Sequence, residues 1–263
     1  LLENTLVYVI LGDNGASKEG TDEGSLKAGL GGLTESEEQI FQYNLKHIDS
    51  IGTASAYNNY PIGWAQAANT PFREWKQDAD AEGGTHNPLI IFYPKLIKQG
   101  GIRNQYGHVI DILPTTLELT GIRKPEYIRG IKQDSIEGTS LAYSIDNANA
   151  ASQHKVQYYY MFGSRSIYAD GWKAEAAHRP DMLDFSYGKI LTTPDKSFDE
   201  DNWQLYNLKD DPTETNDLAK KYPDKLDELK KLINEQAKEN HLYPLINWYD
   251  VLHRRIHHPN GSD

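Results

Sequence analysis

The sequence has no cysteine, which excludes disulfide bonds, thiolate metal sites and a cysteine nucleophile. It is also poor in basic residues: 27 Lys and Arg stand against 38 Asp and Glu, for a net charge of −11. Nucleic-acid binding is therefore not expected, because contacts to phosphate need a basic face. No apolar run approaches the roughly 20 residues that cross a bilayer, so no membrane partner is expected. With 17 Tyr and 5 Trp among 263 residues, the aromatic content of 11% predicts a folded chain.

The first segment with a structural signal is residues 5–11, a β-branched and apolar run that predicts a strand buried on both faces. Gly12 ends this run, and Asp13, Asn14 and Gly15 follow. Open α/β sheets bind their ligands at the carboxyl ends of strands, and carboxylate and carboxamide oxygens are ligands that Ca²⁺ or Mg²⁺ takes. An Asp-Asn-Gly sequence is also typical of a plain turn, so the pair alone leaves both interpretations open. Since a domain seldom begins so close to a buried strand, we expect the chain to be the C-terminal part of a longer protein.

The following residues predict the remaining elements of a first domain, which we place at residues 1–140. Residues 16–32 are rich in glycine and predict a loop. Thr34 and Glu37 form a capping-box pattern that predicts the start of a helix. Residues 88–94 predict a second buried strand, and residues 109–120 a helix that ends at Gly121. The acidic stretch 77–82 is interpreted as a solvated surface.

Residues 137–153 are mostly small and polar, and short strand patterns follow them. We therefore place a second domain at residues 141–263. Four short strands with turn residues between them predict a small antiparallel sheet, at residues 156–162, 165–169, 172–174 and 204–208. Residues 222–233 predict an amphipathic helix with Pro223 at its first position. Its apolar stripe is expected to cover one face of the sheet; the stripe consists of Leu226, Leu229, Leu232 and Ile233.

Five stretches resemble, in the same order along the chain, segments of the type I sulfatases of the alkaline-phosphatase superfamily. Asp13-Asn14-Gly15 resembles the family's second pair of metal ligands. Lys76, followed by Gly83-Gly84 and Pro88, resembles its Lys…Gly-Gly-x-x-x-Pro segment, although one extra residue separates the lysine from the glycines. The other three stretches are an Asp-x-x-Pro-Thr helix at residues 110–121 and C-terminal signatures at residues 171–173 and 205–218. Residues 51–68 are more similar to the bacterial arylsulfatase branch than to the human lysosomal one.

The resemblance implies an α/β fold: the C-terminal part of a mixed sheet sandwiched by helices, plus a small α+β subdomain. It implies that Asp13 is an anionic ligand of Ca²⁺ or Mg²⁺, that Asn14 is a neutral ligand near the attacking oxygen, and that Lys76 contacts the sulfate or the leaving oxygen. The family's nucleophile is a formylglycine made from a Cys/Ser-x-Pro-x-Arg motif, which this sequence does not contain. We therefore expect it in an N-terminal half of the same protein, and we expect the fragment alone to be inactive. The implied substrate is a small-molecule or carbohydrate sulfate ester, and the resemblance favours a periplasmic or secreted location.

Several alternatives stay open at this stage. A phosphonate or phosphate ester hydrolase shares the same metal scaffold, and the fragment alone could be a non-catalytic module, because two ligands hold a divalent ion poorly. Lys76 could be a surface lysine, and His86 is interpreted as a hydrogen-bonded loop residue. The tail histidines have a metal-ligand spacing but are better explained as an exposed basic tail; they are His253, His257 and His258. Asp111 is expected to cap or to hydrogen-bond locally, and Trp172 and Tyr206 are expected to be core aromatics of the small sheet.

Overall fold

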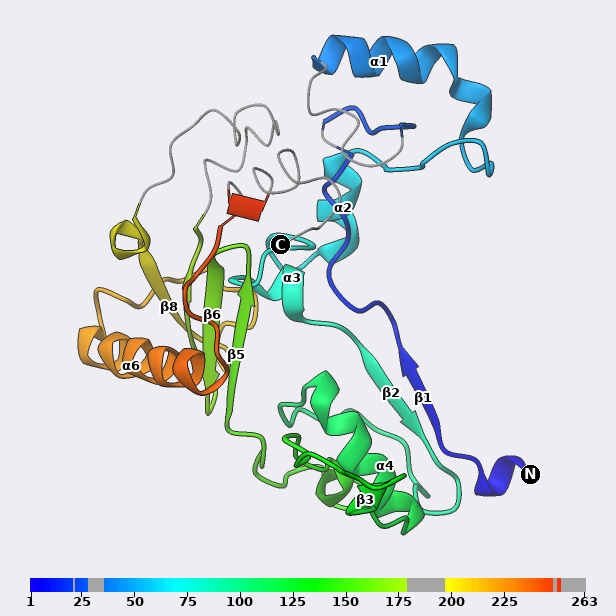
Figure 1. Cartoon of the computed structure of the whole chain (residues 1–263), viewed down its shortest axis with the longest axis vertical. Helices are drawn as coiled ribbons and strands as arrows, with labels where there is room; N and C mark the ends of the chain where they lie inside the picture. The colour runs from blue at the N-terminus through cyan, green and yellow to red at the C-terminus, as the bar shows by residue number, and fades with distance from the viewer. Residues whose placement is uncertain (21, 28–35, 179–196, 248–249, 252–263) are drawn as a thin grey trace. The chain divides into compact units, whose positions relative to one another are not determined.

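The computed structural model describes residues 1–20, 22–27, 36–178, 197–247 and 250–251 (Figure 1). The chain forms two compact units, each built from two segments. Unit 1 comprises Leu1–Leu11 and Pro88–Gln157, and unit 2 comprises Gly12–Asn87 and Tyr158–Asp263. The domain boundary at residue 140 stays a prediction. Among the described helices, none has the length and apolar character needed to cross a membrane.

Unit 1 contains a two-stranded antiparallel sheet in which β1 (Val7–Ile10) pairs with β2 (Leu89–Phe92). Both strands form where the sequence predicts them. The prediction that they are buried on both faces is wrong for the described chain: Val9 is 39% exposed, Ile10 47% and Ile90 53%. The reason is that the two strands form a sheet of their own, so no further strand or helix layer covers both faces.

The other elements of unit 1 are one helix, a hairpin and three short 3₁₀ turns. Helix α4 (Ile112–Thr120) follows the turn η3 (Val109–Asp111) and ends at Gly121, whose φ of +71° is the left-handed cap that the sequence predicts. The hydroxyl of Thr116 donates to the Tyr8 hydroxyl at 3.1 Å and so ties α4 to β1. The remaining elements are η1 (Leu2–Asn4), the hairpin β3 (Tyr127–Ile128) and β4 (Ile131–Lys132), and η4 (Ala142–Ser144).

The Asp111 side chain makes a local hydrogen bond at the start of η3, as expected, and it also binds a distant histidine. Its carboxylate accepts the backbone N–H of His108 at 2.8 Å and that of Thr139 at 2.7 Å. Both of its oxygens lie within 2.9 Å of Nδ1 of His154, which is buried. The hydrogen bond that His154 donates to the Asp111 carboxylate raises the pKa of His154, although burial opposes this. Since Nε2 of His154 faces the carbonyl oxygen of Val156 at 3.1 Å, both ring nitrogens meet acceptors and the imidazolium is favoured.

We expect the free energy of unfolding to fall as the pH rises above about 6.5, the ordinary histidine pKa. A histidine whose folded pKa is raised stabilises the fold below its unfolded pKa, and this contribution is lost as the pH rises through the folded pKa. Urea unfolding of the chain at a series of pH values measures the effect. In the variant His154→Gln the decrease should be smaller, whereas His241→Gln, at an exposed position, should behave like the wild type. An identical pH dependence in wild type and His154→Gln would contradict the assignment.

The sheet of the C-terminal region confirms the predicted small sheet and packed helix. Its strands lie in the order β5 (Val156–Met161), β6 (Ser164–Ala169), β7 (Trp172–Ala176) and β8 (Trp203–Asn207), and β6, β7 and β8 pair antiparallel. Helix α6 (Pro223–Glu239) begins at Pro223 and packs against β6, β7 and β8 through buried Leu229 and Ile233 (Figure 1). Tyr206 is 2% exposed, as a core aromatic should be. Trp172 is only half-buried and meets Tyr222 edge-on, with ring centroids 5.5 Å apart.

The N-terminal segment of unit 2 contributes shorter elements. They are α1 (Glu37–Lys46), η2 (Ile48–Ser50), α2 (Ile62–Asn69) and α3 (Glu82–Thr85). In the second segment of the unit, η6 (Phe198–Glu200) precedes β8. The capping box of α1 is formed by Ser36 and Gln39, so the predicted start of the helix at Thr34 is two residues too early. Both pairs match the capping pattern in sequence, and the later pair makes the hydrogen bonds; Thr34 itself lies outside the described residues.

Candidate active site

Asp13 and Asn14 lie at the start of unit 2, directly after a turn at Gly12 with φ +91°. Asp13 is exposed and Asn14 is half-buried. Within the described part of the chain, no hydrogen bond or ion pair engages either side chain. Their oxygens are therefore available to a ligand. A plain turn accounts for the backbone conformation at Asp13 and Asn14. It does not account for two polar side chains that make no hydrogen bond to another described residue.

Backbone contacts join this turn to the segment that carries Lys76. The amide of Gly15 donates to the carbonyl of Gly84 at 3.3 Å, and the amide of Lys76 donates to the carbonyl of Ala16 at 3.0 Å. The approach is so close that a Cβ at Gly15 would lie 1.8 Å from the carbonyl oxygen of Gly83. A Cβ at Gly83 would in turn lie 2.2 Å from the carbonyl oxygen of Arg73. The glycines of the motif are thus required because three backbone segments meet here.

The ammonium group of Lys76 contacts a carboxylate that the sequence did not single out. Its Nζ lies 3.2 Å from Oε2 of Glu19, and the other oxygen of Glu19 accepts from Gln77 at 2.9 Å. The structure therefore brings together the backbones of Lys76 and the Asp13-Asn14 turn, but not their side chains. The Lys76 side chain is 34% exposed, and ion pairs near the surface contribute only about 0–1 kcal/mol, so an anionic ligand can compete with Glu19 for the ammonium.

The backbone on both sides of Lys76 is strained. Glu74 has φ +66° and Gln77 has φ +79°, a region that residues with a side chain seldom adopt. Such conformations persist only where the surrounding structure enforces them, and they cluster at functional sites. The segment that presents Lys76 is accordingly held in one defined conformation by its neighbours.

The interpretation of residues 77–82 as a solvated acidic surface is wrong. Asp78 and Asp80 are each 2% exposed. Asp78 pairs with Lys18 at 2.9 Å, and Lys18 is itself only 1% exposed. A buried carboxylate needs such a partner, because its desolvation is otherwise costly. The sequence offers no signal for this pair, since the two residues are 60 positions apart.

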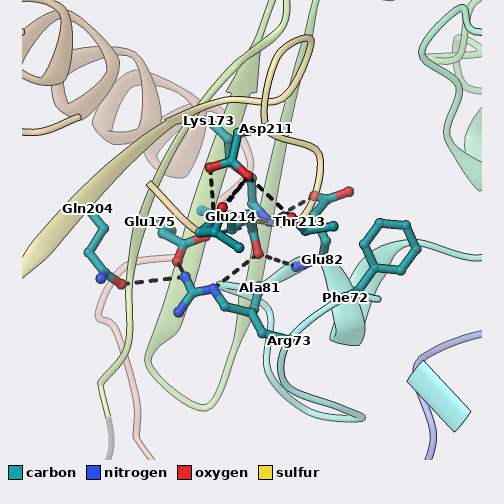
Figure 2. A network of polar contacts seen from close by, with 12 residues as sticks. Phe72, Arg73, Ala81, Glu82, Lys173, Glu175, Gln204, Asp211, Thr213 and Glu214 are labelled. Atoms are coloured by element: carbon teal, nitrogen blue, oxygen red, sulfur yellow. Dashed lines mark hydrogen bonds and ion pairs between the residues drawn. The ribbon is translucent and has the colours of Figure 1, made fainter. Parts of the chain in front are cut away.

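A second set of buried charges fixes the same segment to the C-terminal sheet (Figure 2). Lys173, on β7 and 1% exposed, lies 2.6 Å from Glu214 and 2.9 Å from Glu82. Arg73 pairs with Glu175 on the same strand and lies 3.4 Å from Glu214. Burial opposes the charge on Lys173, but the two carboxylates outweigh it and raise its pKa. Burial would likewise raise the pKa of Glu82, but Lys173 and His86 lower it to about 2.

The remaining candidate residues are placed as follows. His86 bonds to Glu82 at 2.8 Å and stacks on Phe72 at 4.5 Å, which confirms it as a hydrogen-bonded loop residue. The tail histidines lie outside the described residues. Within the described residues, no group of three or more His, Cys, Asp or Glu side chains could hold a metal ion. Asp13 and Asn14 fit a Ca²⁺ or Mg²⁺ site by their free, hard oxygens, but they provide only two of the roughly six to eight oxygens that Ca²⁺ takes.

Comparison with known families and proteins gives consistent matches. Residues 1–122 match the family described as Sulfatase, and residues 80–241 match the family described as N-sulphoglucosamine sulphohydrolase, C-terminal. An uncharacterized sulfatase of Schizosaccharomyces pombe is 31% identical over 87% of this chain. An N-acetylglucosamine-6-O-sulfatase of Bacteroides thetaiotaomicron is 29% identical over 58% of it. The matched regions cover 37% and 25% of these two relatives, so the chain spans about a third of their length or less.

A solved structure shares the fold. It comes from work on the metabolism of multiple glycosaminoglycans by Bacteroides thetaiotaomicron, and it superimposes with a TM-score of 0.51 at 19% identity. The match covers 89% of this chain and 39% of that one. At this level of identity the likeness concerns the arrangement of helices and strands, which agrees with the predicted α/β class.

Proposed function

The chain belongs to the sulfatase family, and we propose that it supplies part of the active site of a metal-dependent sulfuric ester hydrolase. The observation that carries the proposal is the backbone contact between the Asp13-Asn14 turn and the Lys76 segment. Two free oxygen ligands and a partly exposed ammonium group, which the sequence separates by some sixty residues, are presented within one compact unit. This combination suits a doubly charged cation and the sulfate group it would bind.

Each residue has a distinct role in the proposal. Asp13 provides an anionic oxygen and Asn14 a neutral one, and together they would hold Ca²⁺ or Mg²⁺. A divalent cation held by these residues would supply Lewis-acid chemistry toward a sulfate ester. Lys76 places a compact positive charge on the sulfate or on the leaving oxygen. This charge stabilises negative charge that develops as the ester bond breaks.

The rest of the site is assigned to an N-terminal half of the same protein. The sequence has no Cys/Ser-x-Pro-x-Arg motif, and we propose that a formylglycine in that half is the nucleophile. The exposed apolar side chains of β1 and β2 support such a partner, because monomers rarely expose large contiguous apolar patches. Those that are at least 38% exposed are Val9, Ile10, Leu89, Ile90 and Phe92. On this proposal they pack against further elements of the sheet.

For the substrate we propose a small-molecule or carbohydrate sulfate ester. One of the relatives is named an N-acetylglucosamine-6-O-sulfatase, which supports the carbohydrate class. The location that accompanies this proposal is periplasmic or extracellular.

Turnover by the full-length protein tests the reaction class. We expect it to hydrolyse 4-nitrophenyl sulfate with a higher kcat/KM than bis(4-nitrophenyl) phosphate, and to lose this activity when EDTA removes the cation. N-acetylglucosamine 6-sulfate tests the carbohydrate class in the same assay. A preference for the phosphate diester would instead indicate a phosphoester hydrolase of the same superfamily. If the full-length protein hydrolyses neither ester, this result would contradict a catalytic role.

A further inference from the structure

We propose that Glu214 is a positioning residue for Lys76: one carboxylate, outside the candidate site, that holds both ends of the segment on which Lys76 lies. The inference rests on the function proposed for Lys76. It adds a role for the C-terminal sheet, because Lys173 on β7 of this sheet binds the other oxygen of Glu214.

The contacts of Glu214 reach the segment on both sides of Lys76 (Figure 2). Its Oε2 accepts the backbone N–H of Glu82 at 2.9 Å and lies 3.4 Å from Nε of Arg73. Arg73 precedes Lys76 by three positions and Glu82 follows it by six. The amide of Gly83 also donates to the carbonyl of Arg73 at 2.9 Å, so the two ends of the segment lie together. A single side chain can therefore fix both.

Glu214 is itself rigidly placed. It is 3% exposed and has φ +57°, and its amide donates to the carbonyl of Asp211 at 3.3 Å. The Asp211 carboxylate accepts the backbone N–H of Thr215, at 2.8 Å for the shorter of two contacts, and that of Asn216 at 2.8 Å. On the sheet side, Oε1 of Glu214 accepts from Nζ of Lys173 at 2.6 Å. The loop at residues 211–216 and Lys173 on β7 both hold Glu214 in place. Glu214 can therefore fix the position of the irregular segment at residues 73–82.

The segment needs such an external support. Residues 73–81 contain no helix or strand, and Glu74 and Gln77 occupy left-handed conformations on either side of Lys76. Local hydrogen bonds of a regular element therefore do not define the direction in which the lysine side chain leaves the backbone. Fixing the two ends restricts the conformations available between them.

A neutral variant should leave the fold intact. The ion pairs of the network join two cations to three carboxylates, namely Lys173 and Arg73 to Glu82, Glu175 and Glu214. The variant Glu214→Gln changes the formal net charge of the network from −1 to 0, so its two cations are still balanced by two carboxylates. Glutamine can still accept one hydrogen bond through its carbonyl oxygen, but it loses the charge that attracts Arg73 and Lys173.

A double-mutant cycle in the full-length protein separates positioning from general stabilisation. We expect Glu214→Gln to lower kcat/KM for 4-nitrophenyl sulfate by about tenfold, because a small misplacement of a binding group is costly. In a Lys76→Ala background the same change should have no further effect. Glu228→Gln, on the exposed surface of α6, serves as the matched control and should leave kcat/KM unchanged. An equal loss in both backgrounds would show that Glu214 acts independently of Lys76 and would overturn the inference.

Amide hydrogen exchange gives a second measurement that does not depend on activity. In Glu214→Gln the amides of Lys76 and Gly83 should exchange about tenfold faster or more, while the amides paired between β6 and β7 keep their wild-type rates. Unchanged exchange at Lys76 and Gly83 would overturn the inference whatever the kinetics show. If Lys76→Ala alone retains full kcat/KM, the proposed function of Lys76 fails, and the exchange rates still decide whether Glu214 holds the segment.

Discussion

Replacement of Lys76 by alanine is expected to lower kcat/KM for a sulfate ester by about 10²–10³-fold, the usual effect of removing one group that stabilises a developing oxyanion. The variant removes the ammonium but keeps the backbone N–H that donates to Ala16. The glycine contacts that join the segments should therefore persist, and the loss should be kinetic. Measurement of kcat/KM on 4-nitrophenyl sulfate with the full-length protein checks this expectation.

The control for this prediction is another lysine of the same unit. Lys46 lies in the last turn of α1 and is exposed, so Lys46→Ala should leave kcat/KM unchanged. Lys76→Arg keeps the positive charge but replaces a compact ammonium by a larger planar group, and it should retain part of the activity. Full activity in Lys76→Ala would show that Lys76 is a surface lysine paired with Glu19.

The C-terminal part of the fold was predictable because its signals are local. Alternation and turn residues define the strands of the small sheet, and Pro223 with an apolar stripe defines the helix that covers it. Gly121 likewise ends α4 as its position suggests. In each case the residues that decide the structure are neighbours in sequence, so a single sequence contains the information.

Burial and charge pairing were not predictable in the same way. The apolar run at β1 indicates a strand, but its burial depends on which other strands lie beside it. The acidic stretch 77–82 resembles a solvated surface, but Asp78 is buried and pairs with Lys18, and Glu82 pairs with Lys173. These partners lie 60 and 91 positions away. No local pattern specifies such partners.

The candidate site was predictable only in part. The resemblance identifies Asp13, Asn14 and Lys76, but nothing in the sequence shows that Gly15 and Gly83 let their backbones touch. Glu19 and Glu214 were missed as individual residues. The signal for Glu214 is its place in the signature at residues 205–218, whereas its left-handed φ and its long-range contacts require the structure.

The second large effect is expected on the affinity for Ca²⁺. Asp13→Asn keeps an oxygen at the same place and removes its negative charge, and Ca²⁺ affinity depends strongly on the charge of its ligands. We expect the affinity of the full-length protein for Ca²⁺ to fall by about 100-fold or more, since even outer residues of metal sites change affinity by 10–100-fold. The fold should be unaffected, because Asp13 is exposed and makes no bond within the described residues.

Calorimetric titration of Ca²⁺ into the full-length protein, its Asp13→Asn variant and the control Asp49→Asn is the most direct measurement of the proposed metal site. Asp49 is an exposed carboxylate in η2 of the same unit. The account predicts strong binding to the wild type and to Asp49→Asn, and much weaker binding to Asp13→Asn. Equal Ca²⁺ affinity in all three proteins would contradict the assignment of Asp13 and Asn14 as ligands.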